Sequence, residues 1–513
     1  MTPGGSRSRR RKFVSAAGIY TVGTFAQKGA MFLLLPVYAQ LFVLDDYARW
    51  SLFLGLATLL SVTFDVAWSR AVPRMFYEHW HDEAQGRGYL LTTFLQQLLL
   101  IAIGVTVFLS LGRGVLARVT AGKLSYEGFA VPLSLAAAAE AILLFVCATY
   151  RARQAPVPFV SFKIAQVAAQ TFGVLTALFL FSDTVGAAAL GFGIGSFFVA
   201  LVAAGCFARY LLGGRRAKVP FARSFGSNAR FSVPLMFHDY ASWLRNAADP
   251  YIIAHFLALY HVSVYHVGYQ FGLLISLFLY SIDLALAPFL YQMMKEDRAF
   301  RVKYLDISRA IVGATFAVVV TAVLFSREVV VLAFPPNMTE AARIAPLIAA
   351  AYFFHGLYSI YIKAFAFAGR TTWIPLLTLG PTLAGIGLTI LVTPTYGVMG
   401  PVVVTVCSLA LLAIVVYAAA QRVERFDYPV ALHAVCAAFA VATGVFASAL
   451  WNAPLWAALA AKAVLWVVLM ALTWRVFVVG REQRLFRMIT IDLASNADAE
   501  PAWRLAVGDG GNS

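Results

Sequence analysis

The 513-residue sequence has few charged side chains, since Asp, Glu, Lys and Arg together make up only 12% of it. Hydrophobic residues make up 61%, and the mean hydropathy is +0.78. A soluble globular domain is about half apolar and about a quarter charged. The composition therefore excludes a cytosolic enzyme, a secreted disulfide-bonded protein and a disordered chain. It predicts an integral membrane protein that crosses the bilayer many times.

Cysteine is also scarce. Its four copies are Cys147, Cys206, Cys407 and Cys436. All lie in apolar runs without metal-binding spacing, so we expect neither disulfides nor a zinc site. Walker, GxSxG, HExxH and CxxC motifs are all missing from the sequence. We therefore expect no cofactor, no metal centre and no catalytic domain. A transporter, a channel or an intramembrane enzyme remains.

Long runs of apolar residues make up most of the sequence. A helix of about 20 apolar residues crosses a hydrocarbon core of about 30 Å, whereas the strands of a membrane barrel alternate in hydropathy over about ten residues. The continuous runs indicate an all-α membrane protein. Fourteen transmembrane helices are predicted, over the ranges 13–43, 48–70, 88–111, 128–150, 155–182, 184–212, 230–258, 262–291, 304–333, 341–368, 372–393, 397–420, 428–449 and 454–479.

Acidic residues are fewer than basic ones, with 24 Asp and Glu against 40 Lys and Arg and a formal net charge of +16. Fourteen spans leave both termini on one side of the membrane. On that side 28 Lys and Arg residues flank the spans, against six on the other. Loops rich in Lys and Arg stay cytoplasmic. We therefore expect cytoplasmic termini, and a membrane rather than nucleic acid as the partner of the positive charge.

An internal repeat relates the two halves of the chain. An offset of 218 residues aligns Tyr47, after the first span, with Tyr265, after the seventh. Because each half has six spans, the halves have parallel topology, and such transporters bind substrate between them near the midplane. The predicted parts are a basic cytoplasmic N-terminus (1–12), an N-lobe (13–212), a basic cytoplasmic linker (213–229), a C-lobe (230–420), two further helices (428–479) and a cytoplasmic tail (480–513).

Four stretches resemble a known family. They are KGAMFLLLPVYAQLFVLDDYARWSLF (28–53), FSVPLMFHDYASWLRNAADPYIIAHFLALYHVSVYHVGYQF (231–271), LAFPPNMTEAARIAPLIAAAYFFHGLY (332–358) and TPTYGVMGPVVVTVCS (393–408). Together they resemble the Wzx-type polysaccharide (O-antigen and exopolysaccharide) flippases of the multidrug/oligosaccharidyl-lipid/polysaccharide (MOP) exporter superfamily. That superfamily also contains the MATE antiporters and the lipid II flippases.

The resemblance implies a MATE-like, V-shaped fold of two six-helix lobes plus two C-terminal helices. It implies a non-enzymatic flippase in the bacterial cytoplasmic (inner) membrane. The implied substrate is an undecaprenyl-diphosphate-linked oligosaccharide for lipopolysaccharide or exopolysaccharide biosynthesis, moved by alternating access around a cationic cavity. Membrane lipids, a polysaccharide polymerase and glycosyltransferases are the implied partners, and we expect a monomer.

Two cations lie deep in predicted spans. A charge at the bilayer centre costs at least about 2.5–3.5 kcal/mol, so it faces an ionic partner or a watery cavity. Lys28 is too far from either end of its span to reach the surface, and it either faces a cavity or pairs with Asp65 or Asp239. Arg245 suits phosphate oxygens, although Asp249 at i+4 could pair with it instead.

The other charges within or beside the spans have two interpretations each. Lys163 and Lys363 lie nearer the cytoplasmic surface and either line the substrate entrance or extend to the surface. Asp239, Asp249 and Asp283 are candidate ion-coupling groups or counter-ions, and Glu140 is a weaker one. Arg70 and Arg74 end the second span, as topology anchors or as a cytoplasmic gate. Lys462 is expected to reach lipid headgroups.

A different function also fits the interior carboxylates. A MATE-like antiporter of cationic small molecules, coupled to protons or sodium ions, would need unpaired carboxylates in its interior. The sequence keeps this alternative open, whereas an intramembrane glycosyltransferase would need larger exterior loops or a cluster of catalytic carboxylates.

Overall fold

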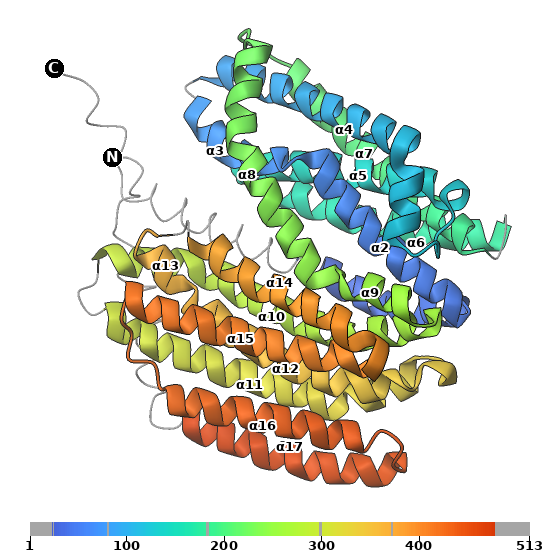
Figure 1. Ribbon diagram of the computed structural model, residues 1–513. Coiled ribbons are helices and arrows are strands. Elements are labelled where there is room, and N and C mark those ends of the chain that lie inside the picture. Colours follow the sequence, from blue (N-terminus) through green and yellow to red (C-terminus); the bar gives the residue numbers. More distant parts are fainter. Residues whose placement is uncertain are drawn as a thin grey trace.

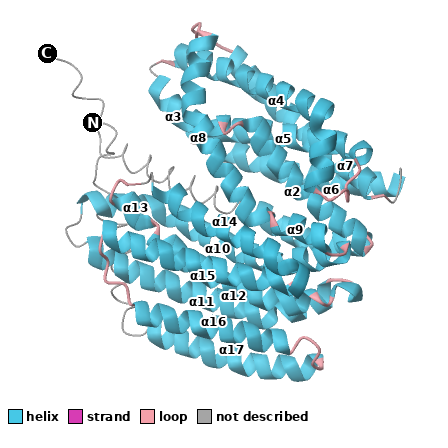
Figure 2. Ribbon diagram, viewed as in Figure 1, coloured by secondary structure: helices cyan, strands magenta, loops and turns pink. Residues whose placement is uncertain are grey.

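The computed structural model describes residues 23, 25–79, 82–180, 184–296, 300–370 and 373–477, which form helices and loops (Figure 2). Residues 25–41 are helical. The elements that follow are α2 (Leu44–Asp65), α3 (Trp68–His79), α4 (Glu83–Val119), α5 (Tyr126–Ala152), α6 (Pro156–Leu180), α7 (Val185–Leu212), α8 (Phe221–Ala247), α9 (Asp249–Phe256), α10 (Leu259–Glu296), α11 (Phe300–Ala333), the 3-10 turn η1 (Pro336–Met338), α12 (Ala341–Tyr361), α13 (Lys363–Phe367), α14 (Trp373–Tyr396), α15 (Met399–Val423), α16 (Val430–Ala449) and α17 (Leu455–Phe477). The predicted terminal segments 1–12 and 480–513 lie outside the described residues.

Twelve helical segments in the described part of the chain are long and apolar enough to cross a membrane. The other two predicted spans correspond to residues 25–41 and to α8 with α9. Helix α8 is more polar than the twelve apolar segments because it carries Ser, Asn, His, Asp and Arg side chains along its length. Three predicted spans are each broken in two, at the α2–α3, α8–α9 and α12–α13 junctions.

The N-lobe is packed through small residues. Helix α5 is rich in buried alanines and lies against α2, α3, α4 and α7. Helices α6 and α7 touch backbone to backbone: a Cβ atom at Gly191 would lie 2.1 Å from the carbonyl oxygen of Gly173, and one at Gly195 would lie 2.2 Å from that of Ala169. Small residues let membrane helices approach this closely.

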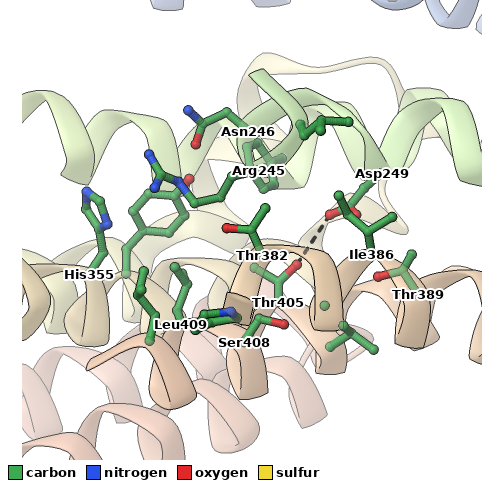
Figure 3. A pocket seen from close by; sticks show the side chains of 17 residues that line it. Arg245, Asn246, Asp249, His355, Thr382, Ile386, Thr389, Thr405, Ser408 and Leu409 are labelled. Atoms are coloured by element: carbon green, nitrogen blue, oxygen red, sulfur yellow. Dashed lines mark hydrogen bonds between the residues drawn. The ribbon is translucent and has the colours of Figure 1, made fainter. Parts of the chain in front are cut away.

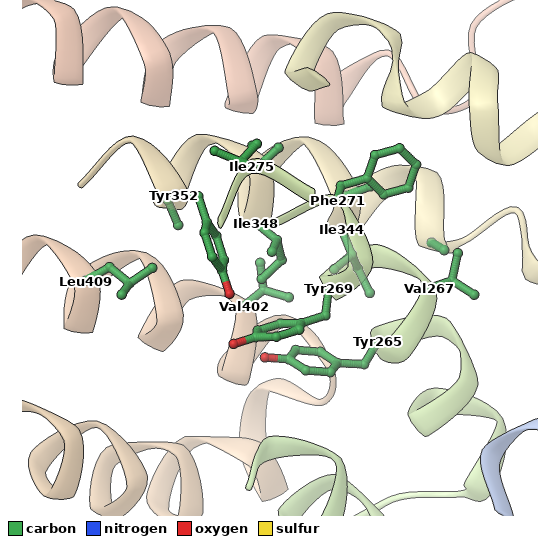
Figure 4. Packing of buried hydrophobic residues seen from close by; sticks show 14 of the residues in the cluster. Tyr265, Val267, Tyr269, Phe271, Ile275, Ile344, Ile348, Tyr352, Val402 and Leu409 are labelled. Carbon is green, nitrogen blue, oxygen red and sulfur yellow. The ribbon is translucent and has the colours of Figure 1, made fainter. Parts of the chain in front are cut away.

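The C-lobe is built around α12, which is buried along most of its length and contacts α10, α11, α15 and α16. Figure 4 shows the packing between α10 and α12, where the rings of Tyr265 and Tyr269 stack 5.7 Å apart. The Tyr269 ring meets that of Tyr352 edge to face at 6.1 Å. Isoleucines at 344 and 348 complete this contact.

The two lobes form a V. They converge where α2 begins and α9 ends, which we call the closed end, and diverge toward α3 and α13, which we call the open end (Figure 1). At the closed end, Ser263 Oγ donates a hydrogen bond to the carbonyl oxygen of Leu44, and the ring of Tyr47 packs on that of His266. These residues belong to the two turns that the 218-residue repeat aligns. The two turns that the repeat aligns therefore lie against each other at the closed end.

Helix α8 runs along the N-lobe before it reaches the C-lobe (Figure 1). Near its start, Tyr89 OH donates to Asn228 Oδ1 at 2.6 Å, and Asn228 Nδ2 donates to Gln96 Oε1 at 3.2 Å. Near its end, Trp243 Nε1 donates to the carbonyl oxygen of Gly55 at 2.8 Å. The helix begins at Phe221, earlier than the predicted 230, because these partners extend it into the segment expected to be a linker.

The last two helices pack on the outside of the C-lobe, where α16 contacts α11 and α12 and α17 contacts α11. Lys462 is fully buried there and donates to Glu328 Oε1 at 2.9 Å, while Arg327 lies 3.7 Å from the same oxygen. The expectation that Lys462 reaches lipid headgroups is therefore wrong. Its side chain faces α11 and is held by an ion pair.

Candidate functional site

Lys28 is an exposed cation between the lobes. Its helix, residues 25–41, contacts α10 through Phe32 and Phe271, whose rings lie 5.9 Å apart, and α6 through a hydrogen bond from Tyr38 OH. Lys28 Nζ lies 5.7 Å from the ring centre of Tyr280 and is repelled by the ammonium group of Lys163. Among the described residues, no carboxylate lies within ion-pair distance of it.

The two ion pairs considered for Lys28 are not formed, because both carboxylates have other partners. Asp65 accepts hydrogen bonds from the backbone N–H and the hydroxyl of Ser69, at 3.3 and 2.8 Å. Asp239 accepts from Arg70.

Lys163 is paired within the N-lobe. Its Nζ atom donates to Glu140 Oε1 at 2.9 Å and to Gln166 Oε1 at 3.3 Å, and Gln166 Nε2 donates to the other Glu140 oxygen at 2.6 Å. This closed triad joins α5 to α6. Lys163 therefore reaches a carboxylate rather than the membrane surface, while it still repels Lys28.

Arg245 lines a pocket of about 610 Å³ that includes space open to solvent. The α8–α9 break at Ala248 and the proline after Asp249 direct both Arg245 and Asp249 toward α10, α12, α14 and α15 (Figure 3). Tyr269, Tyr352 and His355 line the same pocket.

Arg245 and Asp249 are not paired, although they are four residues apart. The Asp249 carboxylate accepts a hydrogen bond from Tyr265 OH at 2.5 Å, and Thr405 Oγ1 lies 3.5 Å from the same oxygen (Figure 3). The carboxylate is thus turned toward α10 and α15. In the described part of the chain, no carboxylate lies within ion-pair distance of Arg245.

The hydroxyl groups of this pocket were not among the predicted site residues. Thr382, Thr389, Thr405 and Ser408 line it, from α14 and α15. A polar helix face could have been predicted here from the spacing of the threonines. They recur in α14 at intervals of four, seven and four residues, which places them on one helix face: Thr378, Thr382, Thr389 and Thr393. Hydroxyl groups can donate to and accept from a sugar or a phosphate.

Lys363 is also paired, in the C-lobe. Its Nζ atom donates to Asp283 Oδ1 and to the carbonyl oxygen of Ser359, both at 2.7 Å. The bond joins α13 to α10. Of the four predicted substrate cations, Lys163 and Lys363 therefore have carboxylate partners, and the structure does not bring them together with Arg245.

Arg70 pairs with Asp239, so that α3 is tied to α8. Arg70 Nε donates to Asp239 Oδ2 at 2.9 Å, and Nη2 donates to the other oxygen. The position of α3 depends on the break before it, where Val66 and Ala67 adopt φ values of 49° and 54°. A β-branched residue at positive φ is strained. Arg74 follows in the same helix, and its side chain lies outside the described residues.

Within the part of the chain that the structure describes, no three His, Cys, Asp or Glu side chains gather closely enough to hold a metal ion. The chemistry of the pocket therefore rests on Arg245, the partly buried carboxylate of Asp249, hydroxyl groups and aromatic rings, and Lys28 is not among the residues that line it.

Comparison with known proteins identifies the fold. The profile described as "Polysaccharide biosynthesis protein" matches residues 13–294, more than half of the chain. The comparison with curated proteins finds no match. Among solved structures, the chain is similar to "Lipid II flippase MurJ, inward closed conformation", with a TM-score of 0.64 and 14% identity over 92% of this chain and 99% of that one.

Two MATE transporters also have similar folds. An inward-facing multidrug resistance MATE family transporter of the MOP superfamily has a TM-score of 0.57 and 15% identity, covering 80% of this chain and 93% of that one. The Vibrio cholerae MATE transporter VcmN in its bent form has a TM-score of 0.53 and 13% identity, covering 82% and 98%. The V-shaped, two-lobed fold expected from the sequence is confirmed.

Proposed function

The chain belongs to the family of polysaccharide biosynthesis proteins and has the fold of MOP-superfamily exporters, and we propose that it flips a lipid-linked oligosaccharide across a membrane. The proposed substrate is an undecaprenyl-diphosphate-linked repeat unit for surface polysaccharide. The chain would act as a transporter rather than an enzyme, in the bacterial cytoplasmic membrane, with both termini in the cytoplasm.

The unpaired cations carry this proposal. Lys28 and Arg245 lie in spans that the repeat aligns, one residue out of register, and neither has a carboxylate partner among the described residues. An unpaired cation at membrane depth costs at least about 2.5–3.5 kcal/mol unless water or an anion faces it. A diphosphate bound between the lobes would supply that anion, and Arg can bind two of its oxygens at once.

Alternating access would proceed by movement of the two lobes of the V relative to each other. The lobes, proposed as 13–212 and 230–420, would separate at the closed end and approach each other at the open end, while the polyprenyl tail stayed in the lipid. The hydroxyl groups and aromatic rings beside Arg245 would face the sugars, because sugars pack on aromatic faces and bond to hydroxyls. A polysaccharide polymerase and glycosyltransferases are the proposed partners of a monomeric protein.

One observation favours a second candidate. Asp249 lines the same pocket as Arg245 and is bonded only to hydroxyl groups among the described residues. A cationic small molecule, or a coupling ion, could approach this carboxylate as in an antiporter. Asp239 and Asp283, by contrast, neutralise Arg70 and Lys363, which fits them better as counter-ions.

The decisive experiment is a gene deletion followed by mass spectrometry of lipid extracts. We expect a complete diphosphate-linked oligosaccharide to accumulate and surface polysaccharide to disappear, with both restored by the wild-type gene. Lys28→Ala/Arg245→Ala should be expressed normally and fail to restore either. A matched control is Arg113→Ala, which removes an exposed cation from the closed end.

Each other result has a defined meaning. Restoration by the double variant would refute the cationic site and keep the flippase. An unchanged lipid extract, together with new sensitivity of the deletion strain to cationic dyes, would favour the antiporter.

A further inference from the structure

A basic surface lies at the open end of the N-lobe, away from the pocket. Its cations come from the start of α4, the α5–α6 turn and the segment between α7 and α8. They are Arg87 and Arg153, which lie over the ring of Tyr210 near the end of α7, and the exposed Arg215, Arg216 and Lys218 of the segment that follows; we call this set the N-lobe basic surface. The flipping mechanism proposed above uses none of these residues.

Tyr210 holds two guanidinium groups close together. The Arg153 guanidinium lies 3.7 Å from the ring centre and that of Arg87 lies 4.9 Å from it. Arg87 is half-buried and also donates to Glu83 at 2.6 Å. Stacking on an aromatic face orders a guanidinium group and leaves its N–H donors available to an anion.

The segment between α7 and α8 is fixed in place. The N–H of Ala217 donates to the carbonyl oxygen of Ala84 at 2.8 Å. Gly88 permits this contact, since a Cβ atom there would lie 2.1 Å from the Ala217 oxygen. Val219 packs against Ala71 and Tyr89. The exposed side chains of Arg215, Arg216 and Lys218 are therefore presented by an ordered backbone.

Few carboxylates neutralise this surface. Glu83 pairs with Arg87, and Asp82 accepts from the N–H of Gln85 as the cap of α4. Among the described residues, no carboxylate lies within ion-pair distance of Arg153, Arg215, Arg216 or Lys218. Leu212, at the end of α7, is 55% exposed beside them. Cations next to an apolar helix end match an anionic lipid, with its phosphate on the cations and its acyl chain on the helix.

We propose that the N-lobe basic surface binds the phosphate group of an anionic membrane phospholipid. A topology signal alone would need only positive charge at this end, whereas the stacked guanidinium groups and the fixed segment form a site with defined geometry. The site is separate from the proposed substrate path, so its occupancy does not depend on the flippase proposal.

The test measures lipid binding to the purified full-length protein in detergent. The probes are dioctanoyl phosphatidylglycerol, dioctanoyl phosphatidylcholine and inorganic phosphate, with native mass spectrometry and thermophoresis as readouts. We expect phosphatidylglycerol to bind more tightly than either other probe. Arg153→Gln/Arg216→Gln should weaken it by about 25-fold, at about fivefold per cation. The control Arg422→Gln/Arg425→Gln makes the same charge change at the open end of the C-lobe, where both residues are exposed, and should leave binding unchanged.

A charge-conserving variant tests the geometry. Gly88→Ala keeps every cation but forces the Ala217 segment away from α4, so we expect weaker phosphatidylglycerol binding, measured at a temperature below the variant's own thermal unfolding midpoint. Wild-type binding by Arg153→Gln/Arg216→Gln, or equal losses in the C-lobe control, would overturn the proposal. Equally tight binding of inorganic phosphate would overturn its assignment to a lipid.

Discussion

Charged side chains in the membrane-spanning helices fall into two kinds. Lys163 and Lys363 each reach a carboxylate in their own lobe, and Lys462 of α17 reaches Glu328 of the C-lobe. Lys28 and Arg245 lie between or beside the lobes without such a partner in the described residues. A buried cation without a partner is costly, and a buried ion pair costs much less. The first kind therefore holds helices together, and the second kind is available to a ligand.

The pair of Lys462 and Glu328 gives a prediction about stability. Glu328→Met leaves a fully buried Lys462 without a carboxylate, and should lower the free energy of unfolding by about 3–5 kcal/mol. Lys462→Met should cost less, because Arg327 remains 3.7 Å from Glu328. The double variant should recover most of the loss. Thermal unfolding in detergent measures all three.

A surface pair is the control for this prediction. Arg113 and Glu127 are both well exposed, so Arg113→Met should change the unfolding free energy by less than about 1 kcal/mol. If Glu328→Met unfolds at the wild-type temperature, the buried pair does not stabilise α17 on the C-lobe.

Helix positions follow closely from hydropathy, but helix breaks do not. Helix α8 ends just before Pro250, which lies in the first turn of α9. Other prolines, such as Pro132 and Pro381, lie inside continuous helices. The α2–α3 break contains neither Pro nor Gly. Instead, Val66 and Ala67 adopt positive φ values there. Tertiary contacts around α3, such as the bond from Arg70 to Asp239, stabilise this strained backbone. Such contacts cannot be predicted from the local sequence.

The contact between α6 and α7 gives a prediction at the scale of helices. Gly191→Val would drive a Cβ atom into the Gly173 carbonyl oxygen, 2.1 Å away, and should lower the unfolding free energy by about 1–3 kcal/mol or more. Gly205→Val is a control on the same helix, because nothing lies within 4 Å of its Cβ position. The two variants are compared by thermal unfolding in detergent, and equal midpoints would mean that close backbone contact is not what stabilises this pair.

At the scale of the whole molecule, the architecture could be predicted better than the candidate site, because the internal repeat predicts two lobes but does not predict which side chains pair. Aligning Tyr47 with Tyr265 predicted two related lobes, and the two turns meet at the closed end. The course of α8 along the N-lobe was missed because its partners, such as Tyr89 for Asn228, are distant in sequence. The sequence also could not predict which cations lack a carboxylate partner. Asp249, for example, could face Arg245 or Tyr265, and the choice depends on how the side chains pack.

Opening of the closed end is the step that alternating access requires, and it can be blocked. In a variant lacking Cys147, Cys206, Cys407 and Cys436, Leu44→Cys and Ser263→Cys would put thiols on the two contacting turns. Joining them by oxidation or with a short thiol-reactive cross-linker should hold the lobes together there. We expect flipping in proteoliposomes to fall more than about tenfold and to return after reduction, because the two lobes can no longer separate.

A cross-link within one lobe separates this effect from general damage. Arg113→Cys/Glu127→Cys joins α4 to α5 at the same end of the N-lobe, where the two side chains form an ion pair. Rigid-body movement of the lobes leaves that distance unchanged, so the cross-linked control should flip at the rate of its reduced form. If the Leu44–Ser263 cross-link also left the rate unchanged, the turns would not need to part. The substrate would then have to cross by a route that leaves the closed end intact, and rocking of two rigid lobes would be the wrong mechanism for this fold.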